Sequence, residues 1–202
     1  MYFKKIALNN ISAILRNLRK IGIEELSFLR RITNDFLVFF VSKSVVIYNS
    51  RGGNTEKVAS SIAEGLGSEA VSSDQIPDLS DYDLIVVGTW VAGGKPSGGG
   101  KEYLSKFNSE QLKDKKVVLF FTAGGVDHSP NASDNIKKTM EQVFAEMEEL
   151  VKDKAEVVEE RLAIRGAFRL FRFGSGMFSR GHPNEEELQQ AKEFGESLKK
   201  YL

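Results

Sequence analysis

From Lys43 onward, short apolar runs alternate with longer segments of helical periodicity. This alternation is typical of β-α units that build a parallel sheet. The expected strands cover residues 44–48, 70–72, 84–88, 117–122 and 156–164. The expected helices cover residues 55–66, 100–107, 131–152 and 185–201. Asn184 and Glu187 form a capping-box pattern at the start of the last helix. The chain is therefore predicted to be an α/β protein.

The amino-terminal residues differ from this pattern, because residues 1–40 are predicted to form two short amphipathic helices. Their longest uncharged run, residues 6–15, is far shorter than the ~20 apolar residues that span a bilayer. No small-residue cleavage site follows it, so we expect neither a transmembrane segment nor a signal peptide. We predict a helical extension over residues 1–43 and a folded domain over residues 44–202. Two explanations of the extension stay open: a start misassigned upstream of Val41, or helices that attach to a dimer partner or an anionic membrane surface.

The composition restricts the chemistry that the chain can perform. It has no cysteine, and its two histidines, His128 and His182, lie far apart. Disulfides, iron–sulfur clusters and cysteine nucleophiles are excluded, and no metal site is expected, so redox chemistry has to come from a bound cofactor. A reducing compartment, the cytoplasm, is the expected location. Residues 1–44 carry eight basic and three acidic side chains, which leaves a net charge of −5 on the remainder of this neutral chain. We therefore expect no nucleic acid partner.

The most informative stretch covers residues 45–55, where an apolar strand runs into a turn rich in glycine and hydroxyl groups that opens a helix. The first N–H groups of a helix have no internal partner, and the helix dipole adds partial positive charge there. Gly52 and Gly53 let the main chain wrap around an anion, and Ser50 and Thr55 add hydroxyl donors. The stretch is therefore predicted to bind a phosphate.

Two other kinds of phosphate loop do not fit. A Walker A loop needs Gly-Lys-Ser/Thr, whereas the first lysine after this turn is Lys57. A dinucleotide fingerprint needs a third glycine where this chain has Glu56 or Lys57. A loop of hydroxyls and amides suits one terminal phosphate, as in a mononucleotide flavin.

Residues 46–62 resemble the FMN-phosphate signature of the flavodoxin family. The matching positions are Tyr48, Ser50, Gly53, Thr55, Ala59 and Ile62. Residues 88–97 and 122–128 resemble the two loops that contact the isoalloxazine ring in this family. The resemblance implies non-covalently bound FMN and a flavodoxin-like doubly wound sheet of five parallel strands in the order 2-1-3-4-5, an order for which flavodoxin is itself the standard example. The cofactor-binding residues that it implies are Ser50, Arg51, Gly52, Gly53, Asn54, Thr55, Thr89, Trp90, Val91, Ala92, Gly93, Ala123, Gly124, Gly125, Asp127 and His128.

A flavin ring needs an apolar wall and main-chain polar groups along its edge. Trp90, the only tryptophan, is expected to supply that wall, and a place in the core is the alternative. The Gly93-Gly94 pair is expected either to turn a carbonyl toward the ring or to form a tight turn. Residues 123–131 lack the tyrosine with which many flavodoxins cover the outer flavin face. His128 is the nearest candidate for that place, or else an exposed bystander. Lys95 would put a cation near the ring and raise its potential.

Residues 165–182 combine basic and aromatic side chains and contain no acid. The residues concerned are Arg165, Phe168, Arg169, Phe171, Arg172, Phe173, Phe178 and Arg180. They form either a patch that docks on an anionic surface or substrate, or phenylalanines that pack on the sheet while the arginines face water.

Three functions are compatible with these features. The leading hypothesis is an electron carrier that accepts electrons from a reductase or a ferredoxin and passes them to an acceptor enzyme. The second is an FMN-dependent oxidoreductase that acts on a quinone, a porphyrinogen or NAD(P)H, which Lys95 and the arginine-rich segment would favour. The third is a module that uses residues 1–40 for assembly or for membrane-surface contact. No catalytic side chain and no metal ligand is predicted.

Overall fold

The computed structural model describes residues 42–169, 177–178 and 181–202, and the chain from Ser42 to Leu202 forms one compact unit. The predicted amino-terminal helices and part of the arginine- and phenylalanine-rich segment lie outside the described residues. Of that segment's arginine and phenylalanine side chains, the structure describes the surroundings of Arg165 alone. Within the described residues, no helix has both the length and the hydrophobicity that crossing a membrane requires.

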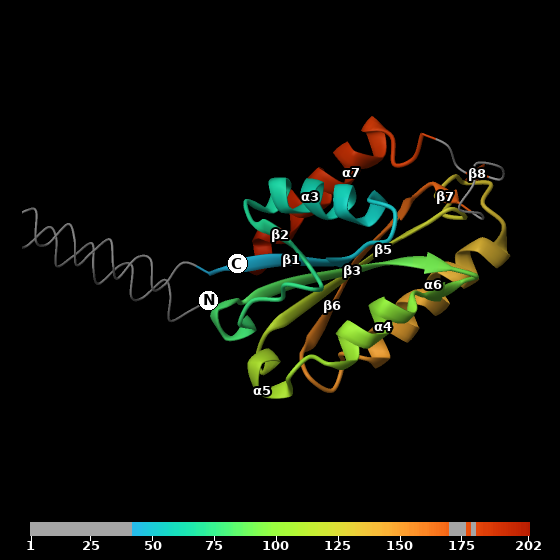
Figure 1. Cartoon of the computed structure of the whole chain (residues 1–202). Coiled ribbons are helices and arrows are strands. Elements are labelled where there is room, and N and C mark those ends of the chain that lie inside the picture. Colours follow the sequence, from blue (N-terminus) through green and yellow to red (C-terminus); the bar gives the residue numbers. More distant parts are fainter. Residues whose placement is uncertain (1–41, 170–176, 179–180) are drawn as a thin grey trace, which may run out of the picture. The chain divides into compact units, whose positions relative to one another are not determined.

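A parallel sheet forms the centre of the unit. Its strands are β1 (Ser44–Asn49), β2 (Glu69–Ser72), β3 (Leu84–Ala92), β5 (Lys116–Ala123) and β6 (Glu156–Arg165). They follow the order β2-β1-β3-β5-β6, and each neighbouring pair is parallel (Figure 1). A short antiparallel strand, β4 (Lys95–Pro96), pairs only with β3. With β4 set aside, this is the predicted order 2-1-3-4-5, so the predicted doubly wound fold is confirmed.

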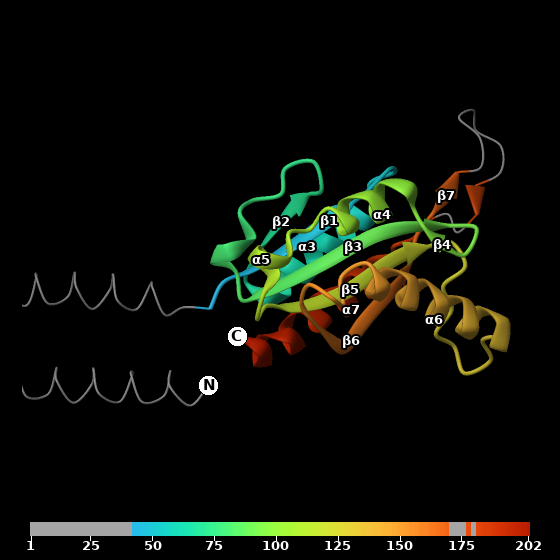
Figure 2. The same cartoon turned by 90° about the horizontal axis from the view of Figure 1, so that it is seen from below.

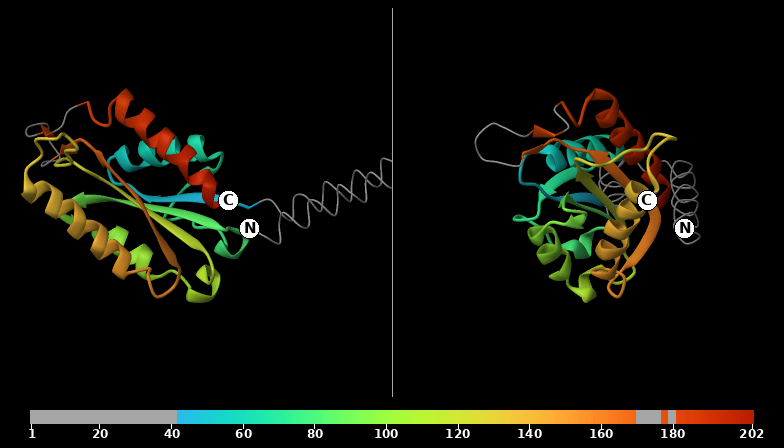
Figure 3. Two further views of the ribbon diagram at one scale, coloured as in Figure 1. Left: turned by 180° about the vertical axis from the view of Figure 1, so that it is seen from behind. Right: turned by 90° about the vertical axis from the view of Figure 1, so that its right-hand side faces the viewer.

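Helices cover both faces of the sheet. One face carries α3 (Asn54–Leu66) and α7 (Glu185–Ser197), and the other carries α4 (Gly98–Ser105), α5 (Ser109–Leu112) and α6 (Asp134–Glu149) (Figure 3). In the view from below, α4 and α6 lie on the face of the sheet that is turned toward the viewer (Figure 2). The structure also has two short 3-10 helices, η1 (Leu79–Asp81) and η2 (Leu198–Tyr201). Because helices shield both faces, the central strands β1, β3 and β5 are apolar along most of their length rather than alternating with polar residues.

Each face of the sheet has its own apolar core. Val45, Ile47 and Ile85 pack under α4 and α6, whereas Val46 and Val86 pack under α3 and α7, and all five are fully buried. This follows from the period of two in a strand, which sends successive side chains to opposite faces. The cores fix the strands laterally and so place the carboxyl ends of β1, β3 and β5 side by side.

The helices α3 and α7 meet backbone to backbone. A Cβ atom on Gly65 would lie 1.9 Å from the carbonyl oxygen of Lys192, and one on Gly195 would lie 2.1 Å from that of Ile62. Only glycine fits at such distances, so the two glycines set how closely α7 packs on α3. The start of α7 is fixed by Asn184 and Glu187, which form the predicted capping box.

The strand predicted over residues 84–88 is shorter than β3 in the structure. The strand runs to Ala92, four residues past the predicted end at Gly88, because β4 folds back against it. Gly93 and Gly94 form the turn between them with φ values of 59° and 74°, a left-handed conformation that favours glycine. The expected tight turn is confirmed, and whether a carbonyl of this pair turns toward the ring stays a prediction. A second hairpin, β7 (Phe168–Arg169) with β8 (Met177–Phe178), lies at the end of the sheet where β3 and β5 finish (Figure 1).

Candidate functional site

Residues 50–55, the turn after β1 and the first two residues of α3, form the phosphate loop. Gly53 adopts a φ of 85° at the N-cap of α3, and no side chain of the described residues caps this helix. The hydroxyl of Ser50 accepts a hydrogen bond of 3.1 Å from the Gly53 N–H and closes the turn. The first N–H groups of α3 are thereby left to face an anion, which is the arrangement that binds phosphate at helix starts. Arg51 and Gly52 are exposed at the mouth of the loop.

Thr55 is held from the sheet. Its side chain is 1% exposed, and its Oγ1 lies 2.8 Å from Oγ1 of Thr122, which is 3% exposed. Thr122 stands near the carboxyl end of β5, after a run of apolar residues. The sequence prediction placed Thr122 at the end of a strand and at the start of the second ring-contacting loop, but not among the cofactor-binding residues. Thr122 is the polar residue that directly follows an apolar run, and this feature of the sequence could have marked it as a residue of the site.

Two residues beyond β6 also contact the phosphate loop. The Nδ2 atom of Asn54 donates a hydrogen bond of 2.8 Å to the carbonyl oxygen of Ala167. Gly166 lies against the same loop, since a Cβ atom placed on it would be 3.4 Å from Cβ of both Asn54 and Thr122. Neither residue was predicted, because their role depends on where β6 ends in space and no motif marks it.

Trp90 lies beside the phosphate loop. Its side chain is half-buried and belongs to neither apolar core of the described residues, and the guanidinium carbon of Arg51 is 5.7 Å from the centre of its ring. The tryptophan is thus placed at the rim of the loop and not in the core. Thr89, its neighbour, points the other way: it is buried, and its Oγ1 lies 2.9 Å from Oγ of Ser97, the residue that caps α4.

A cavity of about 470 Å³ opens between the β3–β4 hairpin, the loop after β5, and α6. Residues 123–128 after β5 are called the ring loop below. Of the predicted cofactor-binding residues, six line the cavity, namely Val91, Ala92, Gly93, Ala123, Gly124 and Gly125. Apolar side chains from β5 and α6 close it, including Phe121, Ile136 and Met140. The cavity therefore offers apolar surface and main-chain polar groups together, which is what a flat heteroaromatic ring requires.

A slightly larger cavity, of about 510 Å³, lies between the loop after β2 and the helices α4 and α5. It contains none of the predicted cofactor-binding residues and neither glycine-rich loop. We place the candidate site at the smaller cavity, because that cavity lies where strands β3 and β5 end and where open α/β sheets bind their ligands.

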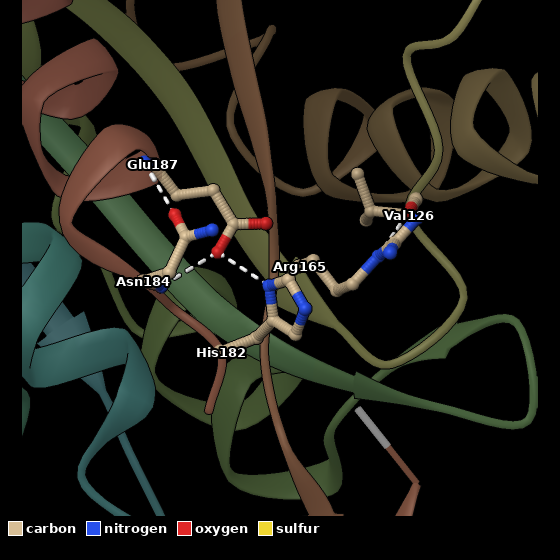
Figure 4. Close-up of polar contacts among 5 residues, drawn as sticks. All are labelled: Val126, Arg165, His182, Asn184 and Glu187. Carbon is tan, nitrogen blue, oxygen red and sulfur yellow. Dashed lines mark hydrogen bonds and ion pairs between the residues drawn. The ribbon is translucent and has the colours of Figure 1, made fainter. Parts of the chain in front are cut away.

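The ring loop is fixed by the end of β6. Nε2 of His128 lies 2.7 Å from the carbonyl oxygen of Ala163. Nε of Arg165 donates a hydrogen bond of 2.8 Å to the carbonyl oxygen of Val126, as Figure 4 shows. A hydrogen bond from the N–H of Ser129 lowers the pKa of Asp127, and the charges of Arg165 and His128 lower it further. Asp127 and His128 do not line the cavity. The structure places both as part of the loop's support.

The chain is similar to known proteins over most of its length. A family model described as a flavodoxin domain matches residues 45–167. An uncharacterised protein of Methanocaldococcus jannaschii is 29% identical over 163 residues, which cover 78% of this chain and 99% of that protein. The flavodoxin-like domain-containing protein BilS of Clostridioides difficile is 25% identical over 174 residues, which cover 77% of this chain and 96% of BilS.

The fold is also found among solved structures. A flavodoxin from the domain Archaea superimposes with a TM-score of 0.53 at 19% identity and covers 78% of this chain and 96% of its own. A likeness at this level of identity shows the same fold.

Proposed function

The chain belongs to the flavodoxin domain family, and on that premise we propose that it binds FMN without a covalent bond and carries electrons between partner proteins. One observation carries the proposal: an uncapped helix start in a glycine turn and an apolar cavity between two glycine-rich loops lie at the same end of one sheet. The first suits a terminal phosphate and the second suits a flat ring.

The residues present fit FMN at both ends. At the phosphate loop, Cβ atoms on Gly52 and Gly53 would meet nothing within 4 Å, so the main chain there is open to a ligand. At the other end, the glycine-rich hairpin and ring loop would present main-chain groups to the polar edge of the ring. When bound, FMN supplies a ring that accepts and releases electrons. The chain's own residues bind the phosphate, orient the ring and exclude water from one side of it.

Trp90 and Arg51 would cover the region between the two ends. The indole of Trp90 provides an apolar plane beside the phosphate loop, and the Arg51 guanidinium lies over it. Arg51 would also bring a positive charge to the phosphate, which adds to the main-chain N–H groups.

A carrier is favoured over an enzyme by the character of the cavity. Among the described residues that line it, none has an acidic or basic side chain, and the polar ones are Asn135 and Thr139 on α6. An enzyme that reduces a small substrate generally needs a positioned proton donor, whereas a carrier does not. Lys95, which the second hypothesis invoked, is exposed on β4 and does not line the cavity.

The visible spectrum of the purified full-length chain tests the proposal. We expect the two flavin absorption bands, their bleaching by a chemical reductant, and release of FMN on denaturation. The reduced protein should pass electrons quickly to a haem protein such as cytochrome c, and NADH or NADPH alone should not reduce it. A chain that takes up no FMN from a reconstitution mixture would contradict the proposal. Rapid reduction by a nicotinamide alone would favour the enzyme.

A further inference from the structure

A three-residue segment, residues 165–167, consists of the last residue of β6 and the two residues after it, and it contacts both halves of the candidate site. Strands β1 and β3 carry the phosphate loop and the hairpin, but the segment comes from the far edge of the sheet. Its three residues run from the ring loop to the phosphate loop within a single stretch of main chain. No part of it was predicted from sequence as a cofactor-binding element.

Toward the ring loop, the segment makes two hydrogen bonds. The N–H of Gly166 donates to the carbonyl oxygen of Ala123 at 3.1 Å, and the side chain of Arg165 donates to that of Val126 at 2.8 Å. Ala123 and Val126 both line the cavity. The two bonds therefore hold the ring loop at its first residue and at its fourth, with the two glycines between them.

Toward the phosphate loop, the segment accepts the hydrogen bond of 2.8 Å that Asn54 donates to Ala167. Gly166 packs against Asn54 and Thr122, as described above. Beyond the segment, the N–H of Ala167 donates to the carbonyl oxygen of His182 at 3.0 Å. His182 in turn contacts Glu187 through Nδ1 at 2.7 Å, so the start of α7 supports the segment from behind (Figure 4).

We infer that residues 165–167 couple the phosphate loop to the ring loop, with Asn54 and Arg165 as the positioning residues of this coupling. The inference rests on the proposed function. A three-residue segment that is hydrogen-bonded at both ends cannot shift at one end without shifting the other. An anion that fixes the phosphate loop therefore fixes the ring loop as well, and a ring in the cavity fixes the phosphate loop. The coupling is reciprocal by thermodynamic necessity.

The test divides FMN into two separate ligands, riboflavin for the ring and inorganic phosphate for the anion. In the full-length apoprotein, riboflavin binding is titrated by flavin fluorescence with and without saturating phosphate. We expect phosphate to tighten riboflavin binding by about five-fold or more, at the lower end of measured couplings between sites. Riboflavin should tighten phosphate binding by the same factor.

Two variants remove the hydrogen bonds of the segment. In Asn54→Ala, saturating phosphate should no longer tighten riboflavin binding. Residue 54 lies in the phosphate loop, so this variant removes the bond at the phosphate end of the segment. Arg165→Met removes the bond at the ring-loop end of the segment and should abolish the effect of phosphate in the same way. Arg165→Lys returns a hydrogen-bond donor and should restore part of that effect. Lys154→Met is the matched control: Lys154 also donates to main-chain carbonyl oxygens, of Leu104 and Ser105, away from the site. Its coupling should equal that of the unaltered protein.

The outcomes separate the two ideas. A protein that binds no FMN overturns the proposed function and the inference with it. A protein that binds FMN, but in which phosphate and riboflavin bind independently, overturns the inference alone. So does a coupling factor that stays unchanged in both Asn54→Ala and Arg165→Met, with folding of each variant checked by circular dichroism.

Discussion

The hydroxyl oxygens of Thr55 and Thr122 lie 2.8 Å apart in the interior, 67 residues apart in the sequence. The pair joins the first turn of α3 to the end of β5. Two hydroxyls carry two hydrogens, and their mutual bond uses one. When Thr122 is the donor, the hydrogen of Thr55 is free to reach an anion in the phosphate loop. Thr122 would then act on FMN through Thr55 without touching it.

The threonine pair makes a prediction about stability and binding. Thr122→Val should lower the free energy of unfolding by roughly 1–3 kcal/mol, because it leaves the Thr55 hydroxyl buried without a partner. The double variant Thr55→Val/Thr122→Val should recover most of that stability, because both polar groups are then gone. Neither variant should recover full FMN affinity. Urea unfolding and FMN titration measure the two quantities, and a double variant that binds FMN normally would show that Thr55 does not contact the phosphate.

The left-handed glycine of the phosphate loop gives a second prediction, with a control built into the same helix. Gly53 and Gly67 flank α3 with φ values of 85° and 77°, and an added Cβ would meet nothing within 4 Å at either position. Gly53→Ala and Gly67→Ala should each cost about 1–2 kcal/mol of stability, because L-residues resist this conformation. Only Gly53→Ala should also weaken FMN binding. Equal FMN affinities in the two variants would show that the phosphate does not bind at the Gly53 turn.

Trp90 gives an optical prediction. If the indole lies against bound flavin, the emission of the flavin is quenched, and the emission of this single tryptophan is quenched in turn. Trp90→Ala should restore flavin fluorescence and raise the dissociation constant, and Trp90→Phe should keep most of the affinity because it keeps an aromatic plane. Flavin lifetimes in the three proteins measure this. Unchanged lifetimes in Trp90→Ala would place the ring elsewhere.

The carboxyl terminus provides a prediction about pH. Glu160 on β6 accepts hydrogen bonds from Lys200 and Tyr201, which lower the pKa of its carboxyl from 4.5 to about 2. Because the folded-state pKa is lowered, the stabilisation is complete above pH 4.5 and is lost as the pH falls through the folded value. Glu160→Gln should therefore destabilise the protein at neutral pH and approach the unaltered protein between pH 4.5 and 2. Urea midpoints across that range measure the difference, with Glu159→Gln as the neighbouring control. A difference that is as large at pH 2 as at neutral pH would contradict the assignment.

The fold was open to prediction because its signals are local. Buried strands such as Val45–Ile47 and the Asn184–Glu187 capping box are written in consecutive residues, and so is the glycine turn at Gly53. The β3–β4 hairpin was missed because its turn resembles a ligand loop in sequence. The structure shows a hairpin because Val91 pairs with Pro96.

The candidate site could be predicted only where one stretch of chain carries it. Thr122 and Ala167 contact the phosphate loop through bonds that span 67 and 113 residues. No spacing rule reports such contacts, because they depend on strand order and on where each strand stops. The sequence prediction also lists Asp127 and His128 as cofactor-binding residues, and neither is among the described residues that line the cavity. Whether they touch FMN stays a prediction.

The contact between Asn54 and Ala167 has a consequence for synthesis of the protein. The phosphate loop is made early, yet the carbonyl that holds it belongs to Ala167, two residues beyond the last strand of the sheet to be translated. Contacts this distant in sequence form late, since the intervening chain must be closed first. A nascent chain that still ends within β5 or α6 thus has the signature residues but not the assembled site. The protein would leave the ribosome empty and acquire its cofactor only after residue 167 has joined the fold.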